Sequence, residues 1–225
     1  MEKQTHQPHI FYLHGTSPRV LLFSGMHGDE YESGALLEQY LIEQAEYLPA
    51  FLYIPQISPS AVAAKTRRNR YGNDINRQFL PTTQDPEARS VMDIVSPYQF
   101  ALCADIHEDP DRTLGFYLYD TDQMSEEELK SYRNCITTTG ARLYTGVDDV
   151  DDEHLMLPVE KGYVSLGFER SGATSGFSSR WLFEASICKR AFTVEIPGKA
   201  PTSLKDAVIR TVIKYLLTVH HTRSQ

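Results

Sequence analysis

The sequence predicts an α/β fold in which a mixed, largely parallel central sheet is flanked by helices in a single compact domain. Two patterns indicate this fold. Apolar stretches alternate with stretches of helical periodicity, and several apolar stretches are continuous, as in strands buried on both faces of a sheet. The length of 225 residues suits one domain, and we expect residues 1–225 to form it, with the core at about 10–220.

The first half of the chain alternates strands with a helix. An apolar strand over 19–24 follows a shorter strand over 10–13, and the next apolar strand, over 51–55, ends at a proline. Between them, residues 33–45 place Ala, Leu and Tyr at helical spacing. This order favours a parallel sheet. Residues 58–81 are long, polar and basic, which is typical of a functional or a disordered loop.

The second half continues with elements of the same kinds. In order, we expect a helix over 85–95, strands over 99–106 and 114–119, helices over 125–137 and 177–187, a strand over 191–196 and a helix over 204–219. Ser125 followed by Glu128 matches a capping box, which marks a helix start. Pro197-Gly198 closes the last strand, and the terminal helix is amphipathic.

The composition is that of a globular protein without a nucleic-acid or membrane partner. The net charge of -8 argues against a nucleic-acid surface, and no apolar run has the length of a membrane span. Cys103, Cys135 and Cys188 are odd in number and far apart, which suits a reducing compartment. Residues 1–9 are polar and lack the apolar core of a signal peptide, so we expect a cytoplasmic protein.

A histidine and a glutamate follow the strand over 19–24 in a glycine-flanked turn, Gly25-Met26-His27-Gly28-Asp29-Glu30. Imidazole nitrogens and carboxylate oxygens are ligands of Zn²⁺, and a catalytic zinc site takes three protein ligands and keeps one position open. Such a pair alone is common, and a helix cap or a surface pair is an equal alternative. The preceding strand and the two glycines favour a metal site at His27 and Glu30.

Two more candidate residues lie at strand ends. His107 directly follows the strand over 99–106, and Glu195 interrupts the apolar strand over 191–196. Open α/β sheets place their sites at the carboxyl ends of strands, so both are expected near His27. A lone histidine there is more often structural. A buried carboxylate is paired, protonated or functional, so Glu195 is either the general base beside zinc-activated water or the partner of a buried arginine.

The basic stretch Arg67-Arg68-Asn69-Arg70-Tyr71-Gly72-Asn73-Asp74-Ile75-Asn76-Arg77-Gln78-Phe79 offers sites for anions. The planar fork of arginine matches a carboxylate in bidentate geometry, so an arginine near zinc suggests a substrate with a free carboxylate. A solvated charged face is one alternative. A phosphate or nucleic-acid patch is another, which the acidic remainder of the chain weakens.

These motifs together resemble the zinc carboxypeptidases of the carboxypeptidase A superfamily. Four motifs carry the resemblance, in order between about Val20 and Gly198: Gly25-Met26-His27-Gly28-Asp29-Glu30, Asp74-Ile75-Asn76-Arg77-Gln78-Phe79, Asp105-Ile106-His107 and Thr193-Val194-Glu195-Ile196-Pro197. The motifs are most similar to those of bacterial murein peptide amidase-like carboxypeptidases, and the succinylglutamate desuccinylase/aspartoacylase branch is the close alternative. The resemblance implies a carboxypeptidase-like, phosphorylase/hydrolase-type α/β fold.

The resemblance also implies a metal centre. In it, His27, Glu30 and His107 would bind one Zn²⁺, and Glu195 would be the general base. Asp74 would orient one of the zinc histidines through a hydrogen bond.

The substrate side follows in the same way. Asn76 and Arg77 resemble the pair that holds the terminal carboxylate of the substrate. Arg67 stands where the family has the arginine that polarises the scissile carbonyl, and Arg68 and Arg70 are alternatives.

Specificity and closure of the site are expected from later residues. Tyr163 is the candidate for the tyrosine that closes over substrate, with Tyr117 and Tyr119 as alternatives. Arg180 precedes Glu195 in the segment that lines the specificity pocket in relatives, and we expect it to favour an acidic side chain or second carboxylate.

The expected activity is zinc-dependent hydrolysis of an amide bond next to a free carboxylate. The motifs favour a metallocarboxypeptidase or cell-wall-peptide amidase acting on a small peptide. An N-acyl amino acid deacylase of the desuccinylase/aspartoacylase kind is the alternative. A non-catalytic zinc- or peptide-binding protein on the same fold is a third hypothesis, and the presence of every role argues against it.

Overall fold

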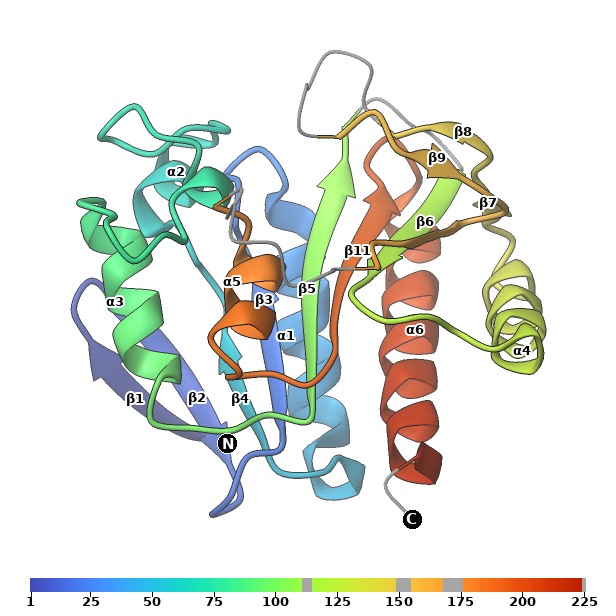
Figure 1. The fold of residues 1–225 in the computed structure, drawn as a ribbon, viewed down its shortest axis with the longest axis horizontal. Helices are drawn as coiled ribbons and strands as arrows, with labels where there is room; N and C mark the ends of the chain where they lie inside the picture. Colours follow the sequence, from blue (N-terminus) through green and yellow to red (C-terminus); the bar gives the residue numbers. More distant parts are fainter. Residues whose placement is uncertain (111–114, 149–154, 168–175, 224–225) are drawn as a thin grey trace.

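The computed structural model describes residues 1–110, 115–148, 155–167 and 176–223. In this part of the chain, the main sheet has nine strands in the order β1-β2-β4-β3-β5-β11-β6-β10, with β7 beside β6 (Figure 1). A second, two-stranded sheet pairs β8 with β9. The strands are β1 Glu2–His6, β2 His9–His14, β3 Val20–Ser24, β4 Phe51–Ile54, β5 Leu102–Asp109, β6 Gly115–Asp120, β7 Arg142–Leu143, β8 Gly146–Val147, β9 Pro158–Val159, β10 Tyr163–Ser165 and β11 Ala191–Pro197.

Six α-helices lie in the described residues, together with two short 3₁₀ helices. The α-helices are α1 Tyr31–Gln44, α2 Pro59–Ala64, α3 Pro86–Val95, α4 Glu126–Thr137, α5 Ser178–Glu184 and α6 Thr202–Arg223. The 3₁₀ helices are η1 Ala45–Tyr47 and η2 Ile75–Arg77.

The centre of the sheet is parallel and its margins are mixed. β4, β3, β5 and β11 are consecutive parallel neighbours. Antiparallel pairs join β1 to β2, β2 to β4 and β6 to β11. The four parallel strands therefore end at one edge of the sheet, where open α/β folds place their sites.

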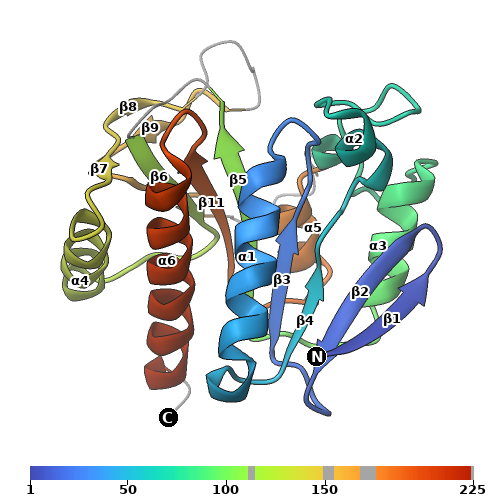
Figure 2. The ribbon, with the colours of Figure 1, turned by 180° about the vertical axis from the view of Figure 1, so that it is seen from behind.

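Helices cover both faces of the sheet (Figures 1 and 2). On one face α1, α4 and α6 pack on a core that includes Leu22, Ala104 and Val194. On the other face α3 and α5 pack on a core that includes Leu21 and Cys103. Because neighbouring strand residues point to opposite faces, a continuous apolar strand supplies both cores. This is why the strands lack polar alternation.

The structure confirms the predicted fold class. The capping box at Ser125 is present, since Glu128 N–H donates to its hydroxyl and the Glu128 carboxylate accepts from its backbone N–H. β5 begins later than predicted and continues through His107 to Asp109. The sequence reading missed β1, α2 and the short strands β7 to β10, whose polar or brief sequences give no periodic signal. Assignment of the whole chain to one catalytic domain stays a prediction.

Within the described ranges, no helix is both long and apolar enough to cross a membrane.

Candidate metal centre and active site

The turn that carries His27 is seated against α2. Gly28 donates its N–H to the Thr66 carbonyl at 2.9 Å. A Cβ on Gly28 would lie 1.8 Å from the carbonyl oxygen of Ala61, so no side chain fits at this position. The glycine after His27 therefore allows the turn after β3 to pack on the neighbouring helix, and this contact fixes the path of the chain toward Glu30.

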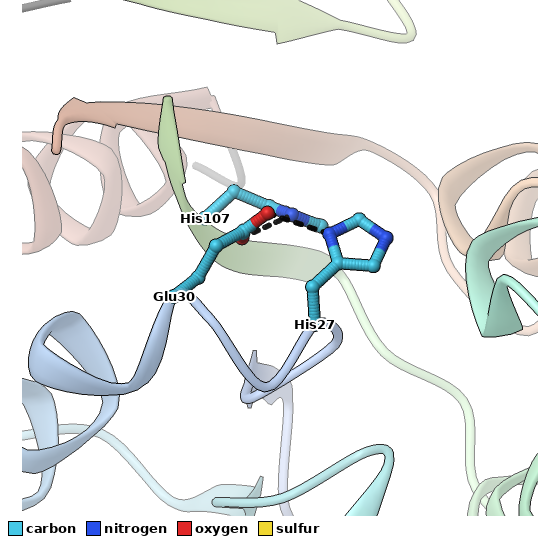
Figure 3. A group of neighbouring side chains, drawn as sticks. All are labelled: His27, Glu30 and His107. Carbon is cyan, nitrogen blue, oxygen red and sulfur yellow. Dashed lines mark hydrogen bonds and ion pairs between the residues drawn. The ribbon is translucent and has the colours of Figure 1, made fainter. Parts of the chain in front are cut away.

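His27, Glu30 and His107 converge on one point (Figure 3). The Nδ1 atom of His27 lies 2.6 Å from Glu30 Oε1, and the Nδ1 atom of His107 lies 2.9 Å from Glu30 Oε2. All three side chains are buried, and one donor atom from each lies within 4.8 Å of the others. The turn after β3 and the end of β5 thus bring together the three residues that the sequence suggested.

Carboxylates also contact the outer nitrogens of both histidines. The Nε2 atom of His27 lies 3.1 Å from Asp74 Oδ1, within hydrogen-bond distance. The Nε2 atom of His107 lies 3.4 Å from Asp105 Oδ2, at ion-pair distance, and has no hydrogen-bond partner in the described residues. Histidines that bind metals usually have such a partner on the second ring nitrogen, which fixes the tautomer and the ring orientation. The sequence reading gave no role to Asp105. Its position two residues before His107, on the same face of one strand, was the available signal.

The electrostatics of the cluster favour a cation at the two Nδ1 atoms. Burial opposes the charged form of His27, but Glu30 and Asp74 outweigh it and raise its pKa. Burial likewise opposes charge on His107, and Asp105 and Glu30 raise its pKa well above the usual value. Burial would raise the pKa of Glu30, yet the two histidines lower it. Two imidazoles and a carboxylate around a position that favours positive charge suit Zn²⁺.

Glu195 stands beside this cluster in the sheet. It is the register partner of His107 on the parallel neighbour β5, and of Tyr117 on the antiparallel neighbour β6. Register partners on adjacent strands project from the same face, and adjacent strands lie about 4.8 Å apart. Burial, together with the charge of Glu30, raises the pKa of Glu195 to about 7, although His107 acts to lower it. Glu195 makes no hydrogen bond or ion pair with any residue in the described ranges, so no buried arginine pairs with it there.

Arg67 is the arginine of the basic loop that reaches the cluster. Its Nη2 atom donates to Asp74 Oδ2 at 2.9 Å, and its Nη1 atom lies 3.5 Å from His27 Nδ1. Its side chain is 46% exposed, so it lies at the mouth of the site. Arg68 and Arg70 instead contact the Gly72 carbonyl and the Tyr71 hydroxyl within their own loop.

Asn76 and Arg77 are joined to the cluster through Asp74. Asn76 donates its N–H to Asp74 Oδ1, the oxygen that faces His27. The Arg77 guanidinium lies 4.0 Å from the centre of the Phe177 ring. Both residues belong to η2, directly after Asp74, so the carboxylate that contacts His27 and the expected anchor share one loop.

Arg180 lies on α5 and pairs with Glu184 of the same helix at 2.7 Å. Its effect on substrate choice stays a prediction.

The structure places Tyr163 on the wrong face of the sheet for closing over a substrate. Tyr163 pairs with Leu118, which pairs with Val194, so its ring shares their face and packs in the helix-covered core opposite Glu195. Its hydroxyl donates to Asp120 Oδ2 at 2.8 Å and accepts from Met124 N–H.

The two alternatives to Tyr163 share the face of Glu195. Tyr117 is the direct register partner of Glu195, and Tyr119 lies two residues farther along β6. Tyr117 donates to Asp109 Oδ2, and Tyr119 donates to Asp148 Oδ2. If a tyrosine of β6 contacts substrate, Tyr117 is in the better position.

Replacing Tyr163 by phenylalanine is expected to affect stability and not catalysis. The change removes a buried hydroxyl and leaves Asp120 and the Met124 N–H each short of one partner, which costs about 1–3 kcal/mol. Urea unfolding measures this loss, and steady-state kinetics should show unchanged kcat and KM. Tyr31→Phe, at a 50% exposed position, is the matched control. A tenfold change in KM at unchanged stability would restore the closing role.

Comparisons with known proteins identify the family and support the fold. The model of the succinylglutamate desuccinylase/aspartoacylase catalytic domain matches residues 16–218. The chain belongs to this family. It is therefore a hydrolase of the carboxypeptidase-like, desuccinylase/aspartoacylase type, and the predicted superfamily is confirmed. The matching branch is the close alternative of the sequence reading. No curated protein matches the sequence.

Several solved structures share the fold of this family member at low sequence identity. A candidate metallopeptidase from Shewanella baltica OS155 has a TM-score of 0.77 and 16% identity, over 97% of this chain and 86% of that one. The murein-tripeptide amidase MpaA from Escherichia coli O157 has a TM-score of 0.56 and 18% identity, over 94% and 86%. A succinylglutamate desuccinylase/aspartoacylase from Rhodobacter sphaeroides has a TM-score of 0.55 and 16% identity, over 92% and 58%.

Proposed function

We propose that the protein is a zinc-dependent hydrolase that cleaves an amide bond next to a free carboxylate. The observation that carries the proposal is the convergence of His27, Glu30 and His107 within 4.8 Å, with Glu195 in register beside His107. Three protein ligands with a neighbouring carboxylate base are the composition of a catalytic zinc site. A bound Zn²⁺ would supply Lewis acidity and lower the pKa of water to about 7.

The residues around the cluster would supply proton transfer, stabilisation of the oxyanion and binding of the substrate carboxylate. Glu195 accepts a proton from the attacking water and returns it to the leaving nitrogen as the carbon–nitrogen bond breaks. Arg67, at the mouth of the site, donates to the oxyanion that develops on the scissile carbonyl. Asn76 and Arg77 hold the free carboxylate of the substrate, so the bond that is attacked is the one beside it.

Two substrate classes fit this arrangement. The family match over residues 16–218 favours an N-acyl amino acid. The likeness to the murein-tripeptide amidase, at a TM-score of 0.56, favours a short peptide with a free carboxyl terminus. Both contain an amide next to a carboxylate, and both use the same anchor, so they differ only in the acyl group.

A substrate screen separates these classes. The zinc-loaded protein is incubated with N-succinyl and N-acetyl amino acids, with dipeptides and with cell-wall peptides, and released amine is measured with and without a chelator. We expect zinc-dependent hydrolysis of one class. Absence of hydrolysis across all classes, with zinc bound, would favour a non-catalytic binding protein.

Arg67→Ala and Arg77→Ala are expected to change different kinetic parameters. Loss of an oxyanion donor lowers kcat by about 10²- to 10³-fold, so Arg67→Ala is expected to lower kcat with a smaller change in KM. Loss of the carboxylate anchor removes a charged hydrogen bond of about 1.5–3 kcal/mol, so Arg77→Ala should raise KM by about 10- to 100-fold. Arg68→Ala, in the same loop, is the control. Equal effects of Arg67→Ala and Arg68→Ala on kcat would refute the assignment.

A further inference from the structure

Ser178 lies between β5 and the loop that carries Asn76 and Arg77. It is the first residue of α5, and it is only 2% exposed. Its hydroxyl donates to Asp105 Oδ2 at 2.9 Å, and its backbone N–H donates to Asn76 Oδ1 at 3.1 Å. One residue therefore bonds both to the carboxylate behind a metal histidine and to the expected substrate anchor.

The Ser178 hydroxyl bonds to Asp105 and does not cap its own helix. A serine at a helix start commonly caps the helix with its hydroxyl, but Phe177 is the N-cap residue of α5 and this helix has no side-chain cap. The same Asp105 oxygen that accepts from Ser178 lies 3.4 Å from His107 Nε2. Asp105 is 1% exposed, and neither its Oδ1 atom nor His107 Nε2 has a hydrogen-bond partner in the part of the chain that the structure describes, so the Ser178 hydroxyl holds this carboxylate at ion-pair distance from His107 without competition from solvent.

The two residues before Ser178 pack against the turn that carries the expected anchor, Asn76 and Arg77. Gly176 accepts a hydrogen bond from Phe79 N–H at 3.0 Å, and the Phe177 ring lies under the Arg77 guanidinium. Gly176 has φ +77°, and a Cβ there would lie 2.3 Å from the Arg77 carbonyl oxygen. Only glycine allows this approach. The position of Ser178 is thus tied to the anchor turn by the backbone hydrogen bond of Gly176, by the Phe177 ring and by its own N–H.

We propose that Ser178 is a positioning residue that orients the metal ligand His107 through Asp105, and that the Gly176 contact holds it in register with the anchor turn. The anchor part rests on the proposed function, whereas the part concerning His107 needs only the metal site. Carboxylates behind metal histidines typically contribute 10- to 100-fold to metal affinity, and Ser178 acts through such a carboxylate.

The first test measures zinc affinity by competition with a chelator of known affinity. Ser178→Ala is expected to weaken zinc binding by about 10-fold, at the lower end of that range. In the Asp105→Asn background the same change should have no further effect, because its route to His107 is already broken. Ser179→Ala, a buried neighbour on the same helix, should leave zinc affinity unchanged. Ser178→Thr, which keeps the hydroxyl, should bind zinc with the affinity of the wild type.

Two results would overturn the proposal: unchanged zinc affinity in Ser178→Ala, or the same further loss in the Asp105→Asn background. If near-UV circular dichroism shows that Ser178→Ala is not folded, Ser178→Cys, a weaker donor of similar size, is measured against the same standard.

Gly176→Ala tests whether the close contact between Gly176 and the Arg77 backbone holds Ser178 in place. The added methyl group must displace the segment from Arg77, so both the zinc dissociation constant and KM should rise, whereas Ser178→Ala should change KM much less. An unchanged zinc affinity in Gly176→Ala would refute the claim that the Gly176 contact positions Ser178. The zinc measurements require no substrate. A protein that hydrolyses nothing would therefore refute the proposed function, and the zinc affinities would still decide the role of Ser178.

Discussion

Replacing Glu195 by glutamine is expected to lower kcat by about 10²- to 10⁴-fold, the usual contribution of a general base. Glutamine keeps the shape of the side chain and cannot accept the proton. The pKa of Glu195 is raised to about 7, because burial disfavours its charged form, so the native carboxylate is well matched to proton transfer near neutral pH. Steady-state kinetics on the substrate found by screening, with the zinc content of each sample determined, measure the effect.

The control for this substitution is Glu126→Gln, on an exposed turn of α4, which should leave kcat unchanged. The zinc content of Glu195→Gln should equal that of the wild type, because Glu195 is outside the set of converging donors His27, Glu30 and His107. A variant with full zinc content and near-native kcat would falsify the assignment of Glu195 as the base.

Local sequence signals were sufficient for the fold class, whereas the grouping of His27, Glu30 and His107 was predicted only when the family resemblance was added to them. The strands before His27 and His107 are continuous apolar runs, and the parallel order of β3, β5 and β11 brings their carboxyl ends to one edge. Parallel order alone places these ends at one edge of the sheet. The contact between His27 and His107 also requires that β3 and β5 be direct neighbours, because each intervening strand would separate their ends by about 4.8 Å more.

The face on which a strand residue lies could not be predicted in the same way. Tyr163 belongs to a three-residue strand, and its face depends on its pairing with Leu118, more than forty residues earlier. A shift of one residue in that register would reverse its direction. The contacts of Ser178 with Asn76 and Asp105 are also non-local, since 102 and 73 residues separate the partners. Periodicity carries no information on such pairs.

Zinc is expected to raise the midpoint of thermal unfolding by about 5–11 °C when the free ion is at 100 times its dissociation constant. Binding to the folded state alone stabilises it by about 2.7 kcal/mol at this ratio. In a domain of this size, 1 kcal/mol moves the midpoint by about 2–4 °C. Scanning calorimetry of the metal-free protein titrated with Zn²⁺ measures the shift. His107→Ala removes one of three ligands and should abolish it at the same zinc concentration, whereas His6→Ala, at an exposed position of β1, should retain it.

The zinc shift also separates the two roles that this site combines. Glu195→Gln should keep the full shift in the unfolding midpoint while losing turnover, since its carboxylate is not among the converging donors. His107→Ala should lose both, because the metal supplies the Lewis acidity that the base depends on. An undiminished zinc shift in His107→Ala would place the bound ion elsewhere on the chain. Loss of the shift in Glu195→Gln would make Glu195 a ligand and leave the base unassigned.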